Sequence, residues 1–449
     1  MKSNFIIIVF TLITLFSRDV IGQDHSFRIV RGKVDTVYNA RHYVVGVTKP
    51  GSTVTINGEK VKQYETGGFG IALNLIKGDN RISVKAVVDN EEVNESFSVF
   101  YKEREVAVDQ TAYRPRGTVP VVSTLKGAYL NSSAGTDRLG GTKINYISEN
   151  VKMELLDSIH NLYKVKLSDN RYSYIPKSFV KRETYGTVVP FSISSSVSVS
   201  NVGNADMVMV ALEGRHPYIV SRELNPNKIV VDIHGAQCNS NWLTHYLDVE
   251  MVDYVECSQS GSDVLSVAIY LKEGYSWGYS VDYSGNSLVV KVKHAPNSTL
   301  KGLIIGLDAG HGGSADGAVS ITGIKEKDLN LEMAYILKEE FEKRGAKVVM
   351  TRTDDRDLSM QERIDILRAG DVNMALSVHC NAGGSPLDAM GASTYYKHID
   401  SRELAKSILV KILELQGVKN FGLVGNFNFS LSSHSDIPIV LVETMFLSS

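Results

Sequence analysis

The stretch LIIGLDAGHGG, Leu303–Gly313, places a histidine among glycines directly after an apolar run. A short apolar run closed by turn-forming residues is typical of a buried strand. His311 therefore stands at the end of a predicted strand, with little beside it to shield the imidazole. The local sequence allows two interpretations, a turn residue or a metal ligand, and the rest of the chain has to separate them.

After this stretch, strand-like and helix-like segments alternate. Apolar residues recur at helical spacing in the segment whose expected N-cap is Asp328 and whose expected stop is Gly345. The later strand-like runs are KVVMT (347–351), VNMALSV (372–378), ASTYYK (392–397) and IPIVLV (437–442), and the later helical stretches are 359–370 and 401–417. This alternation predicts a doubly wound α/β sheet.

Polar residues of catalytic type follow three of these strands. His311, His379 and Glu443 each come directly after a strand-like run, and Glu326 opens the first predicted helix. Open α/β sheets form sites at the carboxyl ends of their strands, so these side chains are expected to meet. Two imidazoles and a carboxylate with one open position match a catalytic zinc site, and the other carboxylate can act as general base. The long spacings include no short local motif, so the residues alone also allow structural roles.

The same region resembles the zinc-dependent N-acetylmuramoyl-L-alanine amidases of bacterial cell-wall turnover. The matching pieces, in family order, are LDAGHGG, GIKEKDLNL, TRTDDRDLSMQERIDI, SVHCNA and PIVLVETMFLS. The resemblance implies that His311, Glu326 and His379 hold Zn²⁺ and that Glu443 is the catalytic general base. It also implies hydrolysis of the amide between the lactyl group of N-acetylmuramic acid and L-alanine in peptidoglycan.

Further residues of these pieces have supporting roles as expectations. Asp308 and Asn381 are expected to orient His311 and His379 from behind, as partners of metal ligands commonly do. Arg352 and Arg363 are expected to hold the ends of strands and helices rather than to touch substrate.

Three strand-rich blocks precede the α/β region. The alternating runs STVTING and NRISVKAVV predict a small β-sandwich over residues 24–102. LYKVKL and RYSYIP, joined by SDN, predict a second β domain over 119–183 that resembles bacterial Src-homology-3-like domains. NPNKIVVDIHG lies in a third β domain, 190–293, that resembles the AMIN module and so implies envelope targeting. The predicted fold is multidomain: three small all-β domains followed by an α/β open-sheet zinc amidase domain, 303–449.

The first residues predict export. Lys2, the apolar run FIIIVFTLITLF and SRDVIGQ match a signal peptide over residues 1–22. The apolar run is shorter than the roughly 18 residues that a membrane span needs, so no transmembrane span is expected in the mature chain. With a formal net charge of −2, nothing indicates a nucleic-acid partner. The expected location is the periplasm or cell envelope, the expected partner is peptidoglycan, and the need for a protein activator stays open.

Two alternatives remain from the sequence. The chain reaches Ser449 just after ETMFLSS, where the family continues with a covering helix, so the amidase domain is expected to be C-terminally short. A shortened amidase domain favours the first alternative, a non-catalytic factor that holds zinc and binds peptidoglycan. A papain-like endopeptidase with Cys380 as nucleophile and His434 as base is the other alternative. Cys238 and Cys257 are either a disulfide or two free thiols.

Overall fold

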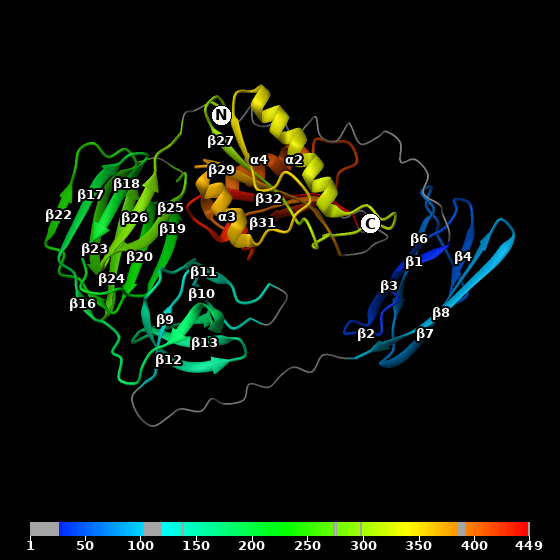
Figure 1. The fold of residues 1–449 in the computed structure, drawn as a ribbon, viewed down its shortest axis with the longest axis horizontal. Helices are drawn as coiled ribbons and strands as arrows, with labels where there is room; N and C mark the ends of the chain where they lie inside the picture. The colour runs from blue at the N-terminus through cyan, green and yellow to red at the C-terminus, as the bar shows by residue number, and fades with distance from the viewer. Residues whose placement is uncertain are drawn as a thin grey trace.

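The computed structural model describes residues 27–102, 119–135, 139–272, 274, 276–296, 299–383 and 391–447. The expected signal peptide, 1–22, and the charged segment 103–118 lie outside these residues. The strands fall into four groups, which we call the first unit (27–102), the second unit (119–183), the third unit (190–294) and the α/β unit (299–447). Figure 1 shows the first unit to one side of the other three. Among the described helices, none combines the length and the apolar character needed to cross a membrane.

The first unit is a sandwich of two antiparallel-rich sheets. One sheet has the order β1-β3-β6 and the other the order β2-β8-β7-β4-β5. The strands are β1 (Arg28–Arg31), β2 (Thr36–Val37), β3 (Arg41–Val47), β4 (Thr53–Ile56), β5 (Glu59–Val61), β6 (Gly68–Asn74), β7 (Gly78–Val88) and β8 (Glu91–Tyr101). Alternate residues of β7, including Ile82 and Val84, are buried between the sheets, which is the period that the sequence shows.

The second unit is a single seven-stranded sheet in the order β11-β10-β14-β13-β12-β9-β15. Its strands are β9 (Val121–Thr124), β10 (Tyr129–Asn131), β11 (Lys143–Tyr146), β12 (Lys152–Ile159), β13 (Leu162–Ser168), β14 (Arg171–Pro176) and β15 (Val180–Arg182), with the 3₁₀ turn η1 (Lys177–Phe179) before the last. The SDN segment joins β13 to β14 as an antiparallel hairpin. The resemblance to a Src-homology-3-like domain stays a prediction.

The third unit packs two main sheets face to face. The five-stranded sheet has the order β22-β17-β18-β26-β25 and the four-stranded sheet the order β19-β20-β24-β23; β16 and β21 form a short parallel pair. The strands are β16 (Ser192–Ile193), β17 (Ser196–Val202), β18 (Ala205–Val210), β19 (Tyr218–Leu224), β20 (Asn227–His234), β21 (Ala236–Gln237), β22 (Trp242–His245), β23 (Val252–Gln259), β24 (Val264–Leu271), β25 (Tyr279–Ser284) and β26 (Ser287–Lys293). Cys238 and Cys257 are free thiols here, and burial raises the pKa of Cys257 to about 11.

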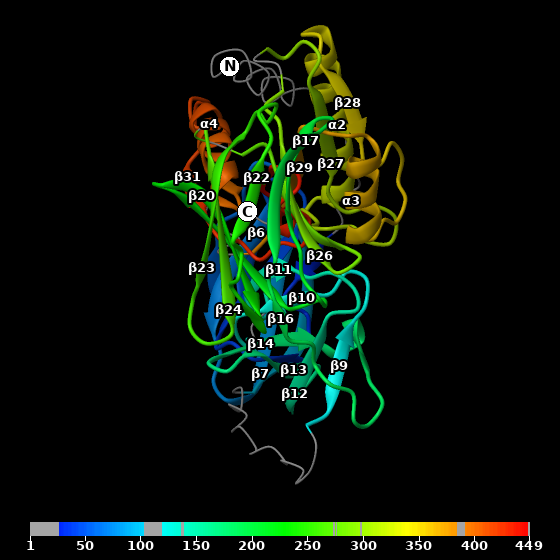
Figure 2. The same cartoon turned by 90° about the vertical axis from the view of Figure 1, so that its left-hand side faces the viewer.

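The second and third units share one apolar core. Buried residues of the second unit such as Met153 and Val165 belong to the same cluster as Ile229 and Val267 of the third. Tyr218 is buried at the seam, where its hydroxyl lies 3.1 Å from Ser148 Oγ. In the view of Figure 2 the third unit faces the viewer and the second lies below it.

The α/β unit carries a six-stranded sheet in the order β28-β27-β29-β32-β30-β31. Its strands are β27 (Ile304–Ala309), β28 (Lys347–Met350), β29 (Met374–Asn381), β30 (Ala392–Tyr395), β31 (Asn420–Val424) and β32 (Ile439–Phe446). Its helices are α2 (Glu326–Lys343), α3 (Met360–Ala369) and α4 (Arg402–Ile412), with 3₁₀ turns η2 (Ile399–Ser401) and η3 (Leu431–Ser433). The first four strands of the order run parallel, and β30 is antiparallel to β32. The α/β open sheet expected from the sequence is confirmed as a mixed, mostly parallel sheet.

Helices cover both faces of this sheet. α2 and α4 bury Met333, Leu337 and Ile408 against one face, whereas α3 buries Ile364 and Leu367 against the other. The carboxyl ends of the parallel strands therefore lie at the same edge of the sheet.

Two helix ends differ in how well the sequence indicated them. Gly345, with a φ of 85°, follows the last turn of α2 as expected. The predicted start of α2 was wrong: the N-cap is Lys325, not Asp328. The helix begins earlier because Glu326 accepts a hydrogen bond from the Ala318 backbone N–H, and this fixes its first residue against the preceding loop.

Candidate metal centre

His311 lies in the turn that directly follows β27. Its φ of 62° is in the left-handed region, and Gly312 continues the turn with a φ of 130°. A histidine in this conformation has to be held there by its surroundings. Arg363 does so by donating from Nη2 to the His311 carbonyl at 2.7 Å. The turn leaves the His311 side chain 32% exposed and places its Nε2 3.2 Å from Glu326 Oε2.

Glu326 places its carboxylate between two imidazoles. Its Oε2 faces His311, and its Oε1 lies 2.9 Å from His379 Nδ1. The backbone N–H groups of Ala318 and Cys380 also donate to this carboxylate, at 2.7 and 3.1 Å. Burial acts to raise the pKa of Glu326, but the hydrogen bonds from the two histidines outweigh it and hold the pKa well below its usual range. Glu326 is therefore an ionised ligand candidate.

His379 lies near the carboxyl end of β29, with its side chain 10% exposed. Its ring stands nearly perpendicular to that of His311, with 5.0 Å between the ring centroids. Phe429 also packs against the His379 ring, with the two ring planes nearly perpendicular and the centroids 6.0 Å apart. His379 Nε2 is buried and has no hydrogen-bond partner among the described residues.

Two glycines make room for this close approach. A Cβ on Gly310 would lie 2.2 Å from the His379 ring. A Cβ on Gly317 would lie 2.5 Å from Glu326 Oε2 and 2.7 Å from the His311 ring. All three distances are far inside van der Waals contact, so any larger residue at either position has to displace a member of the site.

The three side chains fit a zinc ion. One ligand atom from each of His311, Glu326 and His379 can be chosen so that all lie within 4.8 Å of one another. Two imidazoles and one carboxylate are a donor set of catalytic zinc sites, in which the fourth position stays open. The unpartnered Nε2 of His379 independently indicates a missing partner at this place, because buried polar atoms are rarely left unpaired.

Glu443 lies beside this cluster on the neighbouring strand. The parallel register of β29 and β32 pairs His379 with Glu443. Glu443 Oε2 is buried without a hydrogen-bond partner in the described part of the chain. Burial, and then repulsion from the Glu326 carboxylate, raise the pKa of Glu443 to about 8. A carboxyl group that exchanges its proton near neutral pH suits acid–base work.

Buried arginines fix the turn that carries His311. Arg352 donates to the carbonyls of Ala309 and Gly310 at 2.9 and 3.0 Å. Arg363 pairs with Asp308 at 2.7 Å. These contacts agree with the expectation that the arginines hold backbone ends. Among the described residues, Asp308 contacts Arg363, Thr351 and Ser377, so it supports the His311 turn indirectly, through Arg363.

The expectation that Asn381 orients His379 is wrong. Asn381 donates from Nδ2 to the Tyr395 hydroxyl at 3.1 Å, and its Oδ1 accepts from the Ala382 backbone N–H. The register of β29 against β32 shifts between His379 and Asn381, so the alternation that would relate the two side chains is interrupted.

The cysteine-nucleophile alternative does not fit the geometry. Cys380 is buried, its Sγ lies 3.4 Å from Thr444 Oγ1, and burial raises its pKa to about 12. His434 is stacked on Tyr146 of the second unit, with centroids 4.1 Å apart, and precedes β32 rather than following it. The thiol and the imidazole are therefore at opposite ends of the sheet.

The sequence analysis missed three residues that shape the candidate site. Asn330 donates from Nδ2 to both Gly310 O and Glu326 Oε1, each at 3.2 Å. Its place one helical turn after Glu326 was a usable signal. Gly317 and Phe429 had none, because their roles depend on how long loops fold back over the sheet.

Comparison with known proteins gives two family matches. A family model described as N-acetylmuramoyl-L-alanine amidase matches residues 305–449, and an AMIN domain model matches residues 196–292. The uncharacterized protein YqiI of Bacillus subtilis is 32% identical over 154 residues, which cover 33% of this chain and 73% of YqiI.

Similarity also extends to named amidases. The N-acetylmuramoyl-L-alanine amidase LytC of Bacillus subtilis is 32% identical over 173 residues, covering 37% of this chain and 34% of LytC. The chain thus spans about a third of LytC. The solved catalytic domain of CwlV, an N-acetylmuramoyl-L-alanine amidase from Bacillus (Paenibacillus) polymyxa var. colistinus, is 30% identical, with a TM-score of 0.31, and the match covers 33% of this chain and 82% of that domain.

Proposed function

Because the chain belongs to the N-acetylmuramoyl-L-alanine amidase family, we propose that Glu443 is the general base with which it hydrolyses the amide between N-acetylmuramic acid and L-alanine in peptidoglycan. The observation that carries this assignment is the buried, unpartnered Oε2 of Glu443, beside the cluster of His311, Glu326 and His379. A substrate of this kind places the enzyme outside the cytoplasm. Residues 1–22 are, in this proposal, the signal peptide that delivers it to the periplasm or cell envelope.

His311, Glu326 and His379 would hold the zinc ion of this family. When bound, zinc supplies Lewis-acid chemistry: it polarises a carbonyl and lowers the pKa of water. Glu326 contributes the negative charge of the ligand set, which its hydrogen bonds from Ala318 and Cys380 hold in position. Phe429 closes one side of His379 with an apolar ring.

Glu443 would move the proton in two steps. Its carboxylate first accepts a proton from the attacking water, and it then returns that proton to the alanine nitrogen as the C–N bond breaks. One residue can do both because burial raises the pKa of its carboxyl group above the usual range, toward neutrality.

The test replaces Glu443 with an isosteric amide. Glu443→Gln is expected to lower kcat by about 10²- to 10⁴-fold, the usual contribution of general acid–base catalysis, while zinc content stays unchanged. Peptides with a free N-terminal alanine, released from purified peptidoglycan and quantified by mass spectrometry, give the rate; metal analysis gives the zinc content. Glu332→Gln, the same change at an exposed position of α2, is the control.

Activity of Glu443→Gln within a few-fold of wild type would show that Glu443 is not the general base. A wild-type protein that binds zinc and sediments with peptidoglycan but releases no such peptide would instead support the non-catalytic binding factor.

A further inference from the structure

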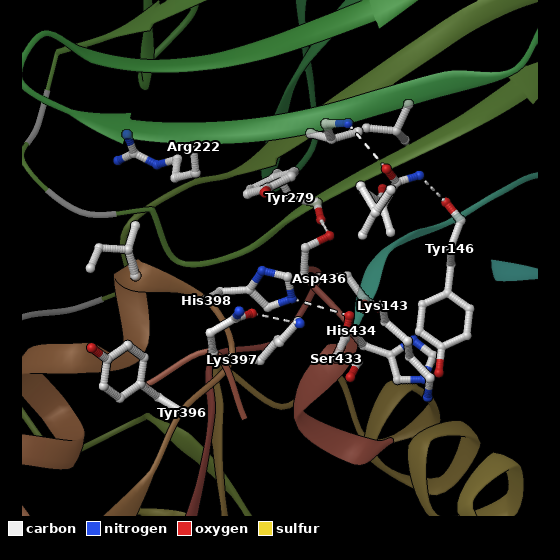
Figure 3. Close-up of a pocket in the computed structure, with 18 of the residues that line it drawn as sticks. Lys143, Tyr146, Arg222, Tyr279, Tyr396, Lys397, His398, Ser433, His434 and Asp436 are labelled. Atoms are coloured by element: carbon white, nitrogen blue, oxygen red, sulfur yellow. Dashed lines mark hydrogen bonds between the residues drawn. The ribbon is translucent and has the colours of Figure 1, made fainter. Parts of the chain in front are cut away.

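A cavity of about 510 Å³ lies where the second, third and α/β units meet. Figure 3 shows Lys143 and Tyr146 entering it from the second unit, Arg222 and Tyr279 from the third, and Lys397, His398 and His434 from the α/β unit. The volume lies within the range of small-molecule sites, about 300–1,000 Å³, which occur preferentially at domain interfaces.

The cavity is separate from the metal centre. Tyr396 to His398 follow β30, and His434 to Asp436 precede β32, which is antiparallel to β30. Both segments therefore lie at the sheet edge opposite to the one that carries His379 and Glu443. From Ile439 to Glu443 alone, β32 spans about 13 Å at the usual rise of a strand.

Positive charge in the cavity exceeds negative charge. Arg222 is neutralised by Asp400 at 3.0 Å. Arg368 is neutralised by Asp436 at 2.6 Å. Lys143 and Lys397 have no carboxylate partner in the described part of the chain: Lys143 Nζ donates to Ser430 Oγ at 3.0 Å, and Lys397 Nζ donates to Asn426 Oδ1 at 2.7 Å.

Holding these two ammonium groups together is unfavourable without a ligand. Lys143 is only 8% exposed. Burial, and then repulsion from Lys397, lower the pKa of Lys143 to about 8, and burial also lowers the pKa of Lys397. The Lys143 ammonium lies over the Tyr129 ring, 4.6 Å from its centroid, and Lys397 is half-buried. Neither contact supplies a negative charge, so an anion in the cavity would be the first opposite charge beside these two lysines in the described part of the chain.

The walls favour an organic ligand. Tyr146, Tyr279 and Tyr396 line the cavity with aromatic rings that an organic group can pack against. Stacking with His434 holds the Tyr146 ring in place.

We propose that this cavity binds a small organic anion with two negative charges, a phosphate monoester or a dicarboxylate, between Lys143 and Lys397. The anion would neutralise one lysine from the second unit and one from the α/β unit. The bound anion would therefore also stabilise the relative placement of the second unit and the α/β unit, because both lysines have to face the cavity.

Calorimetric titration and thermal unfolding of the full chain test this, with glycerol 3-phosphate and glutarate as probes and glycerol as the neutral control. At least one anion is expected to bind saturably and to raise Tm, while glycerol does neither. Binding of glycerol 3-phosphate alone would identify the ligand as a phosphate, and binding of glutarate alone as a carboxylate. Lys143→Gln and Lys397→Gln are each expected to weaken binding by about ten-fold or more, because each removes a charge-assisted hydrogen bond.

Lys181→Gln, at an exposed position of β15 in the second unit, is the matched control and should bind like wild type. The rise in Tm that the anion causes in wild type should be smaller in Lys143→Gln. A purely structural lysine would lower Tm on substitution and leave that rise unchanged. Absence of saturable binding for both anions, or equal binding by all variants, would overturn the proposal.

Discussion

Gly310 has no side chain, and this leaves room for the imidazole of the metal-ligand candidate His379. The site needs His379 against the backbone at Gly310, where a Cβ would lie 2.2 Å from the ring. Gly310→Ala is expected to displace His379 and to lower zinc affinity by at least about ten-fold, the smaller effect usual for disturbing the surroundings of a metal ligand. Competition with a zinc-sensitive chelator measures the affinity.

Gly274→Ala is the matched control, since a Cβ there meets nothing within 4 Å. Neither glycine has a positive φ, so backbone strain does not separate the two variants. Equal zinc affinity in both variants would show that the ring moves aside without cost.

The residues of the candidate site were visible in the sequence because the chemistry of an open α/β sheet is confined to strand ends. That rule alone selected His311, His379 and Glu443, and the structure brings them to one edge with Glu326. It could not find Gly317, whose importance depends on the path of the loop between β27 and α2. The separate expectation that Asn381 orients His379, which came from the matching piece SVHCNA, was wrong, because the sequence does not reveal the shift of register after His379.

Among the strands, β18 carries a buried carboxylate that ties two parts of the third unit together. Asp206 accepts hydrogen bonds from the backbone N–H groups of Glu250, Met251 and Val252, and His294 Nε2 lies 2.8 Å from it. Burial acts to raise the pKa of Asp206, but these hydrogen bonds together hold it below its usual range. The stabilisation is therefore fully present above the unfolded-state pKa of about 3.9 and is lost as pH falls through the lower folded-state value.

Asp206→Asn should consequently lower the stability of the third unit at pH 7 by about 1.5–3 kcal/mol, with the difference from wild type shrinking below about pH 4. Urea unfolding followed by tryptophan fluorescence measures this, because both tryptophans, Trp242 and Trp277, lie in the third unit. Asp253→Asn, at an exposed position of β23, is the control. A difference that stays constant from pH 7 to pH 3 would rule out the carboxylate as its source.

At the level of elements, the order of strands and helices was predictable, but their directions and exact starts were not. Short, continuous apolar runs indicated β27, β29 and β32. Nothing in ASTYYK revealed that β30 runs antiparallel to β32, because strand direction is set by the path of the connections and not by side-chain period. The start of α2 was missed for a similar reason, since a tertiary hydrogen bond to Glu326 fixes it.

Across the whole molecule, one buried ion pair joins the third unit to the α/β unit. Arg222 and Asp400 are 4% and 7% exposed, and Asp400 also accepts a hydrogen bond from the Ser276 backbone N–H. Asp400→Ala leaves a buried guanidinium unpaired, which costs about 3–5 kcal/mol. We expect faster hydrogen exchange at the amides of residues 276–284, measured by mass spectrometry, with zinc content unchanged.

Glu403→Ala breaks the partly exposed pair with Arg402 and serves as control, because surface pairs contribute about 1 kcal/mol or less. Unchanged exchange in Asp400→Ala would mean that the two units are held together by other contacts.

The apolar core shared by the second and third units determines how this protein can be divided. A chain cut between residues 183 and 190 would leave Tyr218 and its neighbours facing water on one fragment and the complementary face bare on the other. Such fragments are candidates for aggregation rather than for autonomous folding. The second and third units are therefore better regarded as one folding unit, which an engineered protein has to carry whole.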